Sequence, residues 1–193
     1  MRSRVFFIIF VLVSLLAFQI EAPKIQPSKS GALAQMADSF GAFSAPEIEG
    51  EAALAQDFLT GEIVYEKNAI YPLPLASLTK IISALAILDL VSLDEDVGTQ
   101  KDEHFRVRDV LAMIMVESSN GAVETLFKHV VKKNGIKLEE SQKWFLELMS
   151  KKAESLGGVG MIFSTIDGAD ASENSAGAMG SAEAMLKIAG ASL

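Results

Sequence analysis

Ser77 and Lys80 stand three residues apart where a proline-containing stretch, 71–76, gives way to a long apolar segment. Residues three apart lie on one face of a helix, so the Lys80 amine is expected to reach the Ser77 hydroxyl if a helix starts near Ala76. A serine hydroxyl is a poor nucleophile until a neighbouring group takes its proton. The two residues are therefore a candidate nucleophile and general base.

Lysine can act as that base only when its amine is neutral, so its pKa must fall. Residues 81–88 are apolar almost throughout, which predicts a helix buried inside a domain. Burial would lower the pKa of the lysine by desolvation, and the positive end of the helix dipole would act in the same direction. The alternative is that Ser77 only caps a helix, and the spacing alone does not decide between the two interpretations.

A second polar motif, Ser118-Ser119-Asn120, follows a segment with helical spacing of apolar residues, 110–117. If this helix end faces the first helix, Ser118 is a candidate proton relay and Asn120 a candidate partner for a substrate amide. The alternative is an ordinary helix terminus that caps the next helix. The pattern recurs at Ser172-Glu173-Asn174, so it carries little weight alone.

Together and in this order, the two motifs resemble the serine penicillin-recognising enzymes, whose signature is Ser-x-x-Lys, then Ser-x-Asn, then Lys-Thr-Gly on a strand. The surrounding sequence most resembles the D-alanyl-D-alanine carboxypeptidases, the low-molecular-weight penicillin-binding proteins of the serine β-lactamase-like superfamily. The likeness extends from about Glu47 to the last residue. The stretches that carry it are 59–68, 74–80, 117–122, 145–157 and 181–189.

This resemblance implies an α+β fold in which an N-terminal β-hairpin joins C-terminal strands in a mixed sheet beside a helical region. It also implies that Ser77 attacks the carbonyl between two terminal D-alanines of a peptidoglycan stem peptide. The implied biological role is cell-wall remodelling. Lys80 would be the general base, Ser118 would return the proton to the leaving amine, and Asn120 would align the peptide. The implied inhibitors are β-lactams, bound covalently, and no cofactor is implied.

The third motif of the family is missing, because no Lys-Thr-Gly, Lys-Ser-Gly or His-Thr-Gly occurs in the 193 residues. In the family that strand supplies a contact to the substrate carboxylate and one oxyanion-hole amide, so this form could be inactive. The sequence is expected to be a fragment or a decayed copy, and its abrupt end after a helical run favours a fragment. Two rival functions stay open: a serine β-lactamase, for which no deacylating carboxylate can be assigned, and an inactive scaffold.

The N-terminal region has the pattern of an export signal or a membrane anchor. Arg2 and Arg4 precede the run 5–20, in which Ser14 and Gln19 are the polar residues. The large Ile20 near the expected cleavage point disfavours cleavage. The sequence therefore predicts a signal peptide or anchor at 1–22, a flexible linker at 23–46 and the N-terminal part of a transpeptidase domain at 47–193. The domain is expected outside the cytoplasm, tethered to the cytoplasmic membrane, or secreted if the N-terminal segment is cleaved.

Composition excludes several other classes of protein. The chain has 25 acidic and 17 basic residues, and its net charge of −8 argues against a nucleic-acid partner. It has no cysteine, so disulfides and thiolate metal sites are excluded. His104 and His129 lie too far apart in sequence to form a recognisable ligand motif, and no metal site is predicted.

The order of elements is one hairpin followed by helices. Strand-forming residues on both sides of Thr60-Gly61 predict a β-hairpin from 51–59 and 62–67. Apolar spacing predicts helices at 77–91, 108–116, 122–133, 139–155 and 181–189. The segments 93–103 and 157–180 are predicted as turn-rich connections, and everything after the hairpin is expected to be helical.

Overall fold

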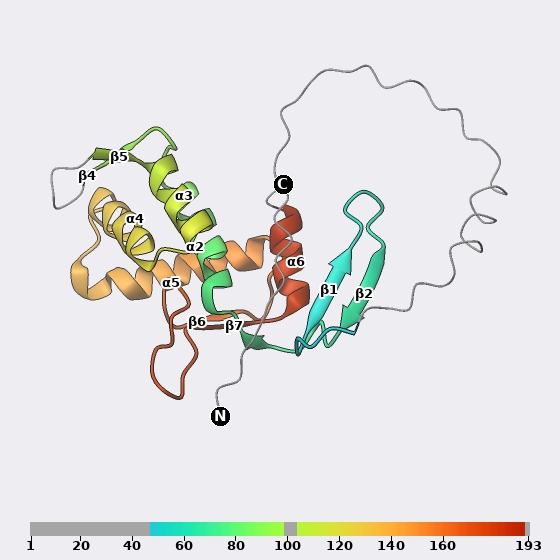
Figure 1. Cartoon of the computed structure of the whole chain (residues 1–193). Coiled ribbons are helices and arrows are strands. Elements are labelled where there is room, and N and C mark those ends of the chain that lie inside the picture. Colours follow the sequence, from blue (N-terminus) through green and yellow to red (C-terminus); the bar gives the residue numbers. More distant parts are fainter. Residues whose placement is uncertain (1–46, 99–103, 192–193) are drawn as a thin grey trace, which may run out of the picture. The chain divides into compact units, whose positions relative to one another are not determined.

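The computed structural model describes residues 47–98 and 104–191 (Figure 1). The chain divides into two units, 1–51 and 52–193, and all the elements below belong to the second. The predicted signal or anchor at 1–22 and the linker at 23–46 lie outside the described residues. Within the described part, none of the helices has the length and apolar character needed to cross a membrane.

The predicted hairpin is present. Strands β1 (Ala53–Gln56) and β2 (Ile63–Lys67) pair antiparallel, with Ala53 opposite Lys67. The strands are shorter than predicted because the turn already begins at Asp57, whose carboxylate accepts hydrogen bonds from the amides of Leu59 and Thr60 at 2.8 Å each. Local side-chain bonds of this kind offer the backbone an alternative to the sheet ladder.

The prediction that everything after the hairpin is helical is wrong. Strands β3 (Leu73–Pro74), β7 (Ala178–Gly180) and β6 (Ile162–Phe163) form an antiparallel sheet in the order β3-β7-β6. Strands β4 (Asp96–Gly98) and β5 (His104–Arg106) form a further pair. Strands of two or three residues are too short to show an alternation of apolar and polar residues, so the sequence pattern does not predict them.

Each predicted helix is present with shifted ends. The helices are α2 (Thr79–Leu88), α3 (Val107–Glu117), α4 (Asn120–Lys133), α5 (Leu138–Ser155) and α6 (Ala182–Ala191). The first predicted helix, 77–91, is divided, because a 3₁₀ turn, η1 (Ala76–Leu78), precedes α2 and the chain turns again at Asp89. This division matters because it places Ser77 on the 3₁₀ turn and Lys80 on the α-helix.

Helix α2 is the centre of the core, as the apolar run predicts. It packs against α3, α4 and α5 (Figure 1). Its Ile82 and Ile87 are fully buried, as are Phe145 and Met149 of α5. The ring of Phe145 meets that of Phe127 edge to face, with centroids 5.3 Å apart. A helix held on several sides in this way is a rigid base for the residues at its N-terminal end.

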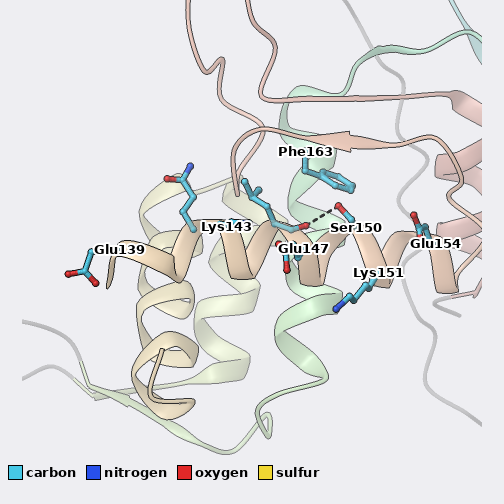
Figure 2. A pocket seen from close by; sticks show the side chains of 9 residues that line it. Glu139, Lys143, Glu147, Ser150, Lys151, Glu154 and Phe163 are labelled. Carbon is cyan, nitrogen blue, oxygen red and sulfur yellow. Dashed lines mark hydrogen bonds between the residues drawn. The ribbon is translucent and has the colours of Figure 1, made fainter. Parts of the chain in front are cut away.

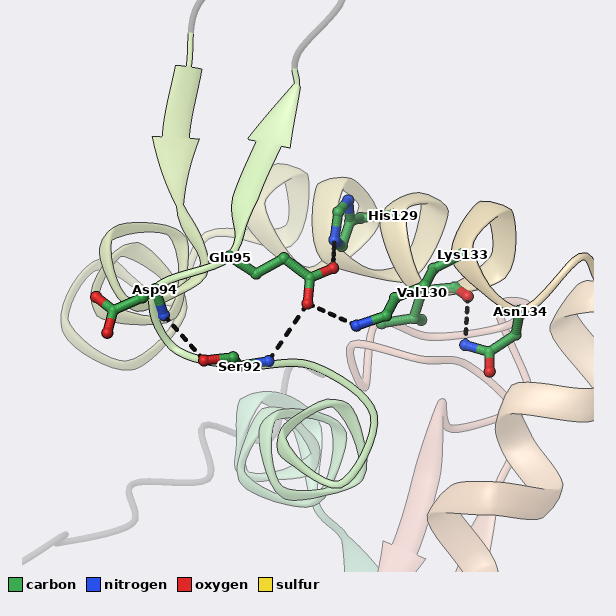
Figure 3. A network of polar contacts seen from close by, with 7 residues as sticks. All are labelled: Ser92, Asp94, Glu95, His129, Val130, Lys133 and Asn134. Atoms are coloured by element: carbon green, nitrogen blue, oxygen red, sulfur yellow. Dashed lines mark hydrogen bonds and ion pairs between the residues drawn. The ribbon is translucent and has the colours of Figure 1, made fainter.

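The loop between α2 and β4 is fastened to α4 by one carboxylate (Figure 3). Glu95 Oε1 lies 2.8 Å from Nε2 of His129, and its Oε2 accepts a hydrogen bond from Lys133 Nζ at 2.5 Å. The hydrogen bonds from Lys133 and His129 lower the pKa of Glu95 to about 2. The charged form of Glu95 is therefore the form that stabilises the fold.

Glu95→Gln is expected to lower the free energy of unfolding by about 1–2 kcal/mol at pH 7, because it removes the negative charge that pairs with Lys133. A pKa below its ordinary value means that the stabilisation is complete above pH 4.5 and is lost as the pH falls towards 2. Urea unfolding at pH 7 and pH 3 measures this, and the difference between parent and variant should shrink at pH 3. Glu147→Gln, on the exposed face of α5, is the control, and an equal loss there would contradict the prediction.

Candidate active site

The chain reaches Ser77 through a short strand and a strained residue. The Leu75 amide donates a hydrogen bond to the Ala178 carbonyl at 3.0 Å, which extends the β3–β7 pairing to the edge of η1. Ala76 then adopts a left-handed conformation with φ of 46°. Such a conformation costs a non-glycine residue on the order of 1–2 kcal/mol, so its neighbours must hold it in place. The result is that Ser77 is exposed at the start of a buried helix.

Lys80 is buried beside Ser77. Only 3% of its surface is exposed, although it carries an ionisable amine. Its Nζ donates hydrogen bonds to Ser77 Oγ at 3.2 Å and to the Asp167 carbonyl at 3.0 Å. Burial lowers the pKa of Lys80, and the negative charge of Asp167 acts in the opposite direction. The amine is therefore within reach of the hydroxyl and is easier to deprotonate than a free lysine.

The segment 166–168 forms the wall behind Lys80, and sequence reasoning missed it. The fully buried Ser83 donates a hydrogen bond from its hydroxyl to the Ile166 carbonyl. Gly168 is buried and has φ of 81°, and its Cα lies against the Ala76 carbonyl and the fully buried Thr79. The Asp167-Gly168 dipeptide is typical of turns, but nothing in it indicates which helix the turn contacts.

Ser118 and Asn120 lie at the turn between α3 and α4. Ser118 is exposed and ends α3 in a left-handed conformation, with φ of 55°. Ser119 caps α4 by accepting a hydrogen bond from the Ala122 amide at 3.2 Å, and Asn120 is the exposed first residue of that helix. Over the described residues, no hydrogen bond links Ser118 or Asn120 to Ser77 or Lys80. The structure thus brings Ser77 and Lys80 into contact and places Ser118 and Asn120 at the junction of α3 and α4.

An open groove of about 690 Å³ lies along α5. Figure 2 shows the side chains that line it. Alternating charges line it, among them Glu139, Lys143, Glu147 and Lys151, with Phe163 at its side. Neither Ser77 nor Lys80 belongs to its lining. In the part of the chain that the structure describes, no group of three or more histidine, aspartate or glutamate side chains is placed to hold a metal ion.

Comparison with curated proteins finds a D-alanyl-D-alanine endopeptidase from Escherichia coli. The two are 29% identical over an alignment of 130 residues that covers 59% of this chain and 39% of that protein. The chain therefore spans well under half the length of this relative. No protein-family model matches the sequence.

Comparison with solved structures finds penicillin-binding proteins. A penicillin-binding protein from Listeria monocytogenes, with ampicillin bound, superposes with a TM-score of 0.61 at 22% identity, over 77% of this chain and 63% of that one. A D-alanyl-D-alanine carboxypeptidase from Mycobacterium tuberculosis superposes with a TM-score of 0.62 at 20% identity, over 79% of this chain and 59% of that one. A D-alanyl-D-alanine carboxypeptidase from Francisella tularensis superposes with a TM-score of 0.61 at 23% identity, over 76% of this chain and 37% of that one.

These comparisons confirm the expected fold. The chain has part of the α+β fold of the penicillin-binding DD-peptidases, and the curated relative supports the resemblance to low-molecular-weight penicillin-binding proteins in sequence as well. The predicted roles of Ser77, Lys80, Ser118 and Asn120 stay predictions, because a shared fold does not establish a reaction.

Proposed function

We propose that this chain carries the nucleophile half of a serine-type D-Ala-D-Ala carboxypeptidase site, with Ser77 as the nucleophile. The observation that carries the proposal is the buried Lys80 amine, 3.2 Å from the Ser77 hydroxyl and with a lowered pKa. Burying an amine costs free energy unless a partner or a function compensates for it, and perturbed lysines beside a hydroxyl are typical of activated nucleophiles.

In the proposed reaction, neutral Lys80 accepts the proton of the Ser77 hydroxyl as Oγ attacks the carbonyl carbon between the two terminal D-alanines. The tetrahedral intermediate collapses to an ester on Ser77 when the C–N bond breaks. The proton reaches the leaving D-alanine amine through Ser118, and Asn120 holds the peptide. The Ser77 amide offers one oxyanion donor. Water then hydrolyses the ester and restores the hydroxyl.

The proposed substrate and inhibitors follow from this chemistry and from the relatives. The curated relative is named a D-alanyl-D-alanine endopeptidase, and the Listeria structure holds ampicillin. We therefore propose peptidoglycan stem peptides as substrates of the whole protein and β-lactams as covalent inhibitors. In the family that the sequence resembles, the second oxyanion donor comes from the Lys-Thr-Gly strand, a motif that the 193 residues do not contain, and losing one such donor costs about 10²–10³-fold in rate.

The proposed location is outside the cytoplasm. Arg2 and Arg4 before the apolar run 5–20 support a tether in the cytoplasmic membrane, with the basic residues inside and the domain outside. A peptidase that acts on cell-wall peptides requires this topology, because its substrate lies beyond the membrane.

A fluorescent penicillin tests the assignment of the nucleophile. The chain is expected to become covalently labelled over hours, and Ser77→Ala should abolish the label because, among the described residues, Ser77 carries the hydroxyl that is hydrogen-bonded to the Lys80 amine. Ser172→Ala, in the exposed second Ser-x-Asn sequence, is the control and should label like the parent. Band intensity after denaturing electrophoresis measures the result.

Each outcome separates the proposal from its rivals. Unchanged labelling in Ser77→Ala would contradict the assignment of the nucleophile. If the parent chain takes no label at all, catalysis by this chain is refuted, and the non-catalytic scaffold is the favoured rival. Rapid loss of label with turnover of a chromogenic cephalosporin would favour a β-lactamase.

A further inference from the structure

We propose that Asp167 is a positioning residue for Lys80: its carbonyl oxygen turns the lone pair of the amine towards Ser77, and the negative charge of its carboxylate favours the ammonium form of that amine. The inference rests on the proposed function and deepens it. It assigns a role to a residue that lies outside both sequence motifs.

The carbonyl fixes the direction of the amine. Lys80 Nζ has two oxygen partners, the Asp167 carbonyl at 3.0 Å and Ser77 Oγ at 3.2 Å. A carbonyl oxygen can only accept, so it must bind an N–H of the amine in either protonation state. A neutral amine has one lone pair, and with one N–H bound to Asp167 that lone pair can accept the Ser77 hydroxyl. The base is therefore oriented before substrate arrives.

The carboxylate of the same residue is held in place within its own turn. Oδ1 of Asp167 accepts a hydrogen bond from the Ala169 amide at 3.0 Å, which closes an Asx turn. The residues on either side are anchored on the active-site helix, Ile166 by the hydroxyl of Ser83 and Gly168 by its close approach to the Ala76 carbonyl. Asp167 itself is half-buried, so this charge is only partly screened by water.

The two effects of this surrounding on Lys80 oppose each other. Burial lowers the pKa of Lys80, and the Asp167 charge raises it. Helices α3, α4 and α5 also pack on α2. Among the described residues, none of the ionisable groups on these helices contributes to the pKa shift of Lys80. Lys152 of α5 is paired with Asp89, at the opposite end of α2 from Lys80, at 2.7 Å. Asp167 is thus the charge that offsets the burial.

Asp167→Asn tests the charge without removing the turn, because the amide oxygen of asparagine can still accept from Ala169. Loss of the negative charge destabilises the ammonium form, so the titration midpoint of Lys80 should move to lower pH by about one unit. The ¹³Cε shift of ¹³C-labelled lysine measures this in the 193-residue chain, with the Lys80 signal assigned by its loss in Lys80→Met. Asp170→Asn, an exposed neighbour in the same loop, should leave the midpoint unchanged.

This readout does not depend on catalysis, so it separates the inference from the proposed function. If Ser77 takes no penicillin but the midpoint moves in Asp167→Asn alone, the proposed function fails and the positioning of the amine stands. If labelling does occur, the acid limb of its pH–rate profile should move in the same direction as the midpoint. An unchanged midpoint, or an equal shift in Asp170→Asn, overturns the inference. Asp167→Ser, which also caps the turn without charge, replaces the asparagine variant if that variant does not fold, and is judged by the same midpoint.

Discussion

Lys80→Met is expected to slow the acylation of Ser77 by a fluorescent penicillin by about 10²–10⁴-fold, the usual contribution of a general base. Methionine has nearly the same length as lysine and fills the same buried slot, but it has no lone pair basic enough to take the serine proton. The fold should survive, because the change also removes the cost of burying an amine, which offsets the loss of its hydrogen bonds to Ser77 and Asp167. Labelling time courses with parent and variant at equal concentration measure the rates.

Lys143→Met, on the exposed side of α5, is the control for replacing a lysine by a methionine. It should label at the parental rate. If Lys80→Met retained labelling within threefold of the parent, another group would be acting as the base and the reading of the Ser77–Lys80 pair would be wrong.

Gly168→Ala is expected to cost about 2–4 kcal/mol of stability and to abolish labelling of Ser77. The added Cβ would collide with the Ala76 carbonyl and come 2.6 Å from Thr79 Oγ1. Both of these are fixed parts of the entry into α2, so either the loop moves away from Lys80 or η1 is displaced. Urea unfolding gives the change in stability, and penicillin labelling gives the effect on the site.

Gly160→Ala provides a matched control. Gly160 has φ of 80°, almost the same as the 81° of Gly168, but a Cβ added there would meet nothing within 4 Å. The control therefore carries the cost of the left-handed backbone, about 1 kcal/mol, without the collision. Equal losses in the two variants would show that the contact between Gly168 and the start of α2 does not matter.

The parts of the site that sequence could predict are those set by local geometry. Ser77 and Lys80 are three residues apart, so one turn of 3₁₀ and α-helix brings them together whatever surrounds them. The hairpin follows from strand-forming residues on both sides of Thr60-Gly61, and the burial of α2 follows from its continuous apolar run. Both are local features of the sequence.

The parts that sequence could not predict are set by contacts across the chain. Asp167 lies 87 residues from Lys80, and neither it nor Gly168 belongs to a recognisable motif. The pairing of β3 with β7 joins residues more than a hundred positions apart through strands of two and three residues. The mixed 3₁₀ and α start of the first helix depends on this pairing and on Ala76, so its boundary could not be placed from propensity alone.

The turn between α3 and α4 distributes separate duties over three consecutive polar residues. Ser118 takes a backbone conformation that most side chains resist, Ser119 binds a free amide at the start of α4, and Asn120 is the first residue that the anchored helix presents to solvent. Ser119, the middle residue of this Ser-x-Asn sequence, therefore has a structural role as the N-cap of α4. Loss of Ser119 would remove the cap that holds the first turn of α4, so a mutational screen that scores only lost activity could not separate this structural effect from a chemical role.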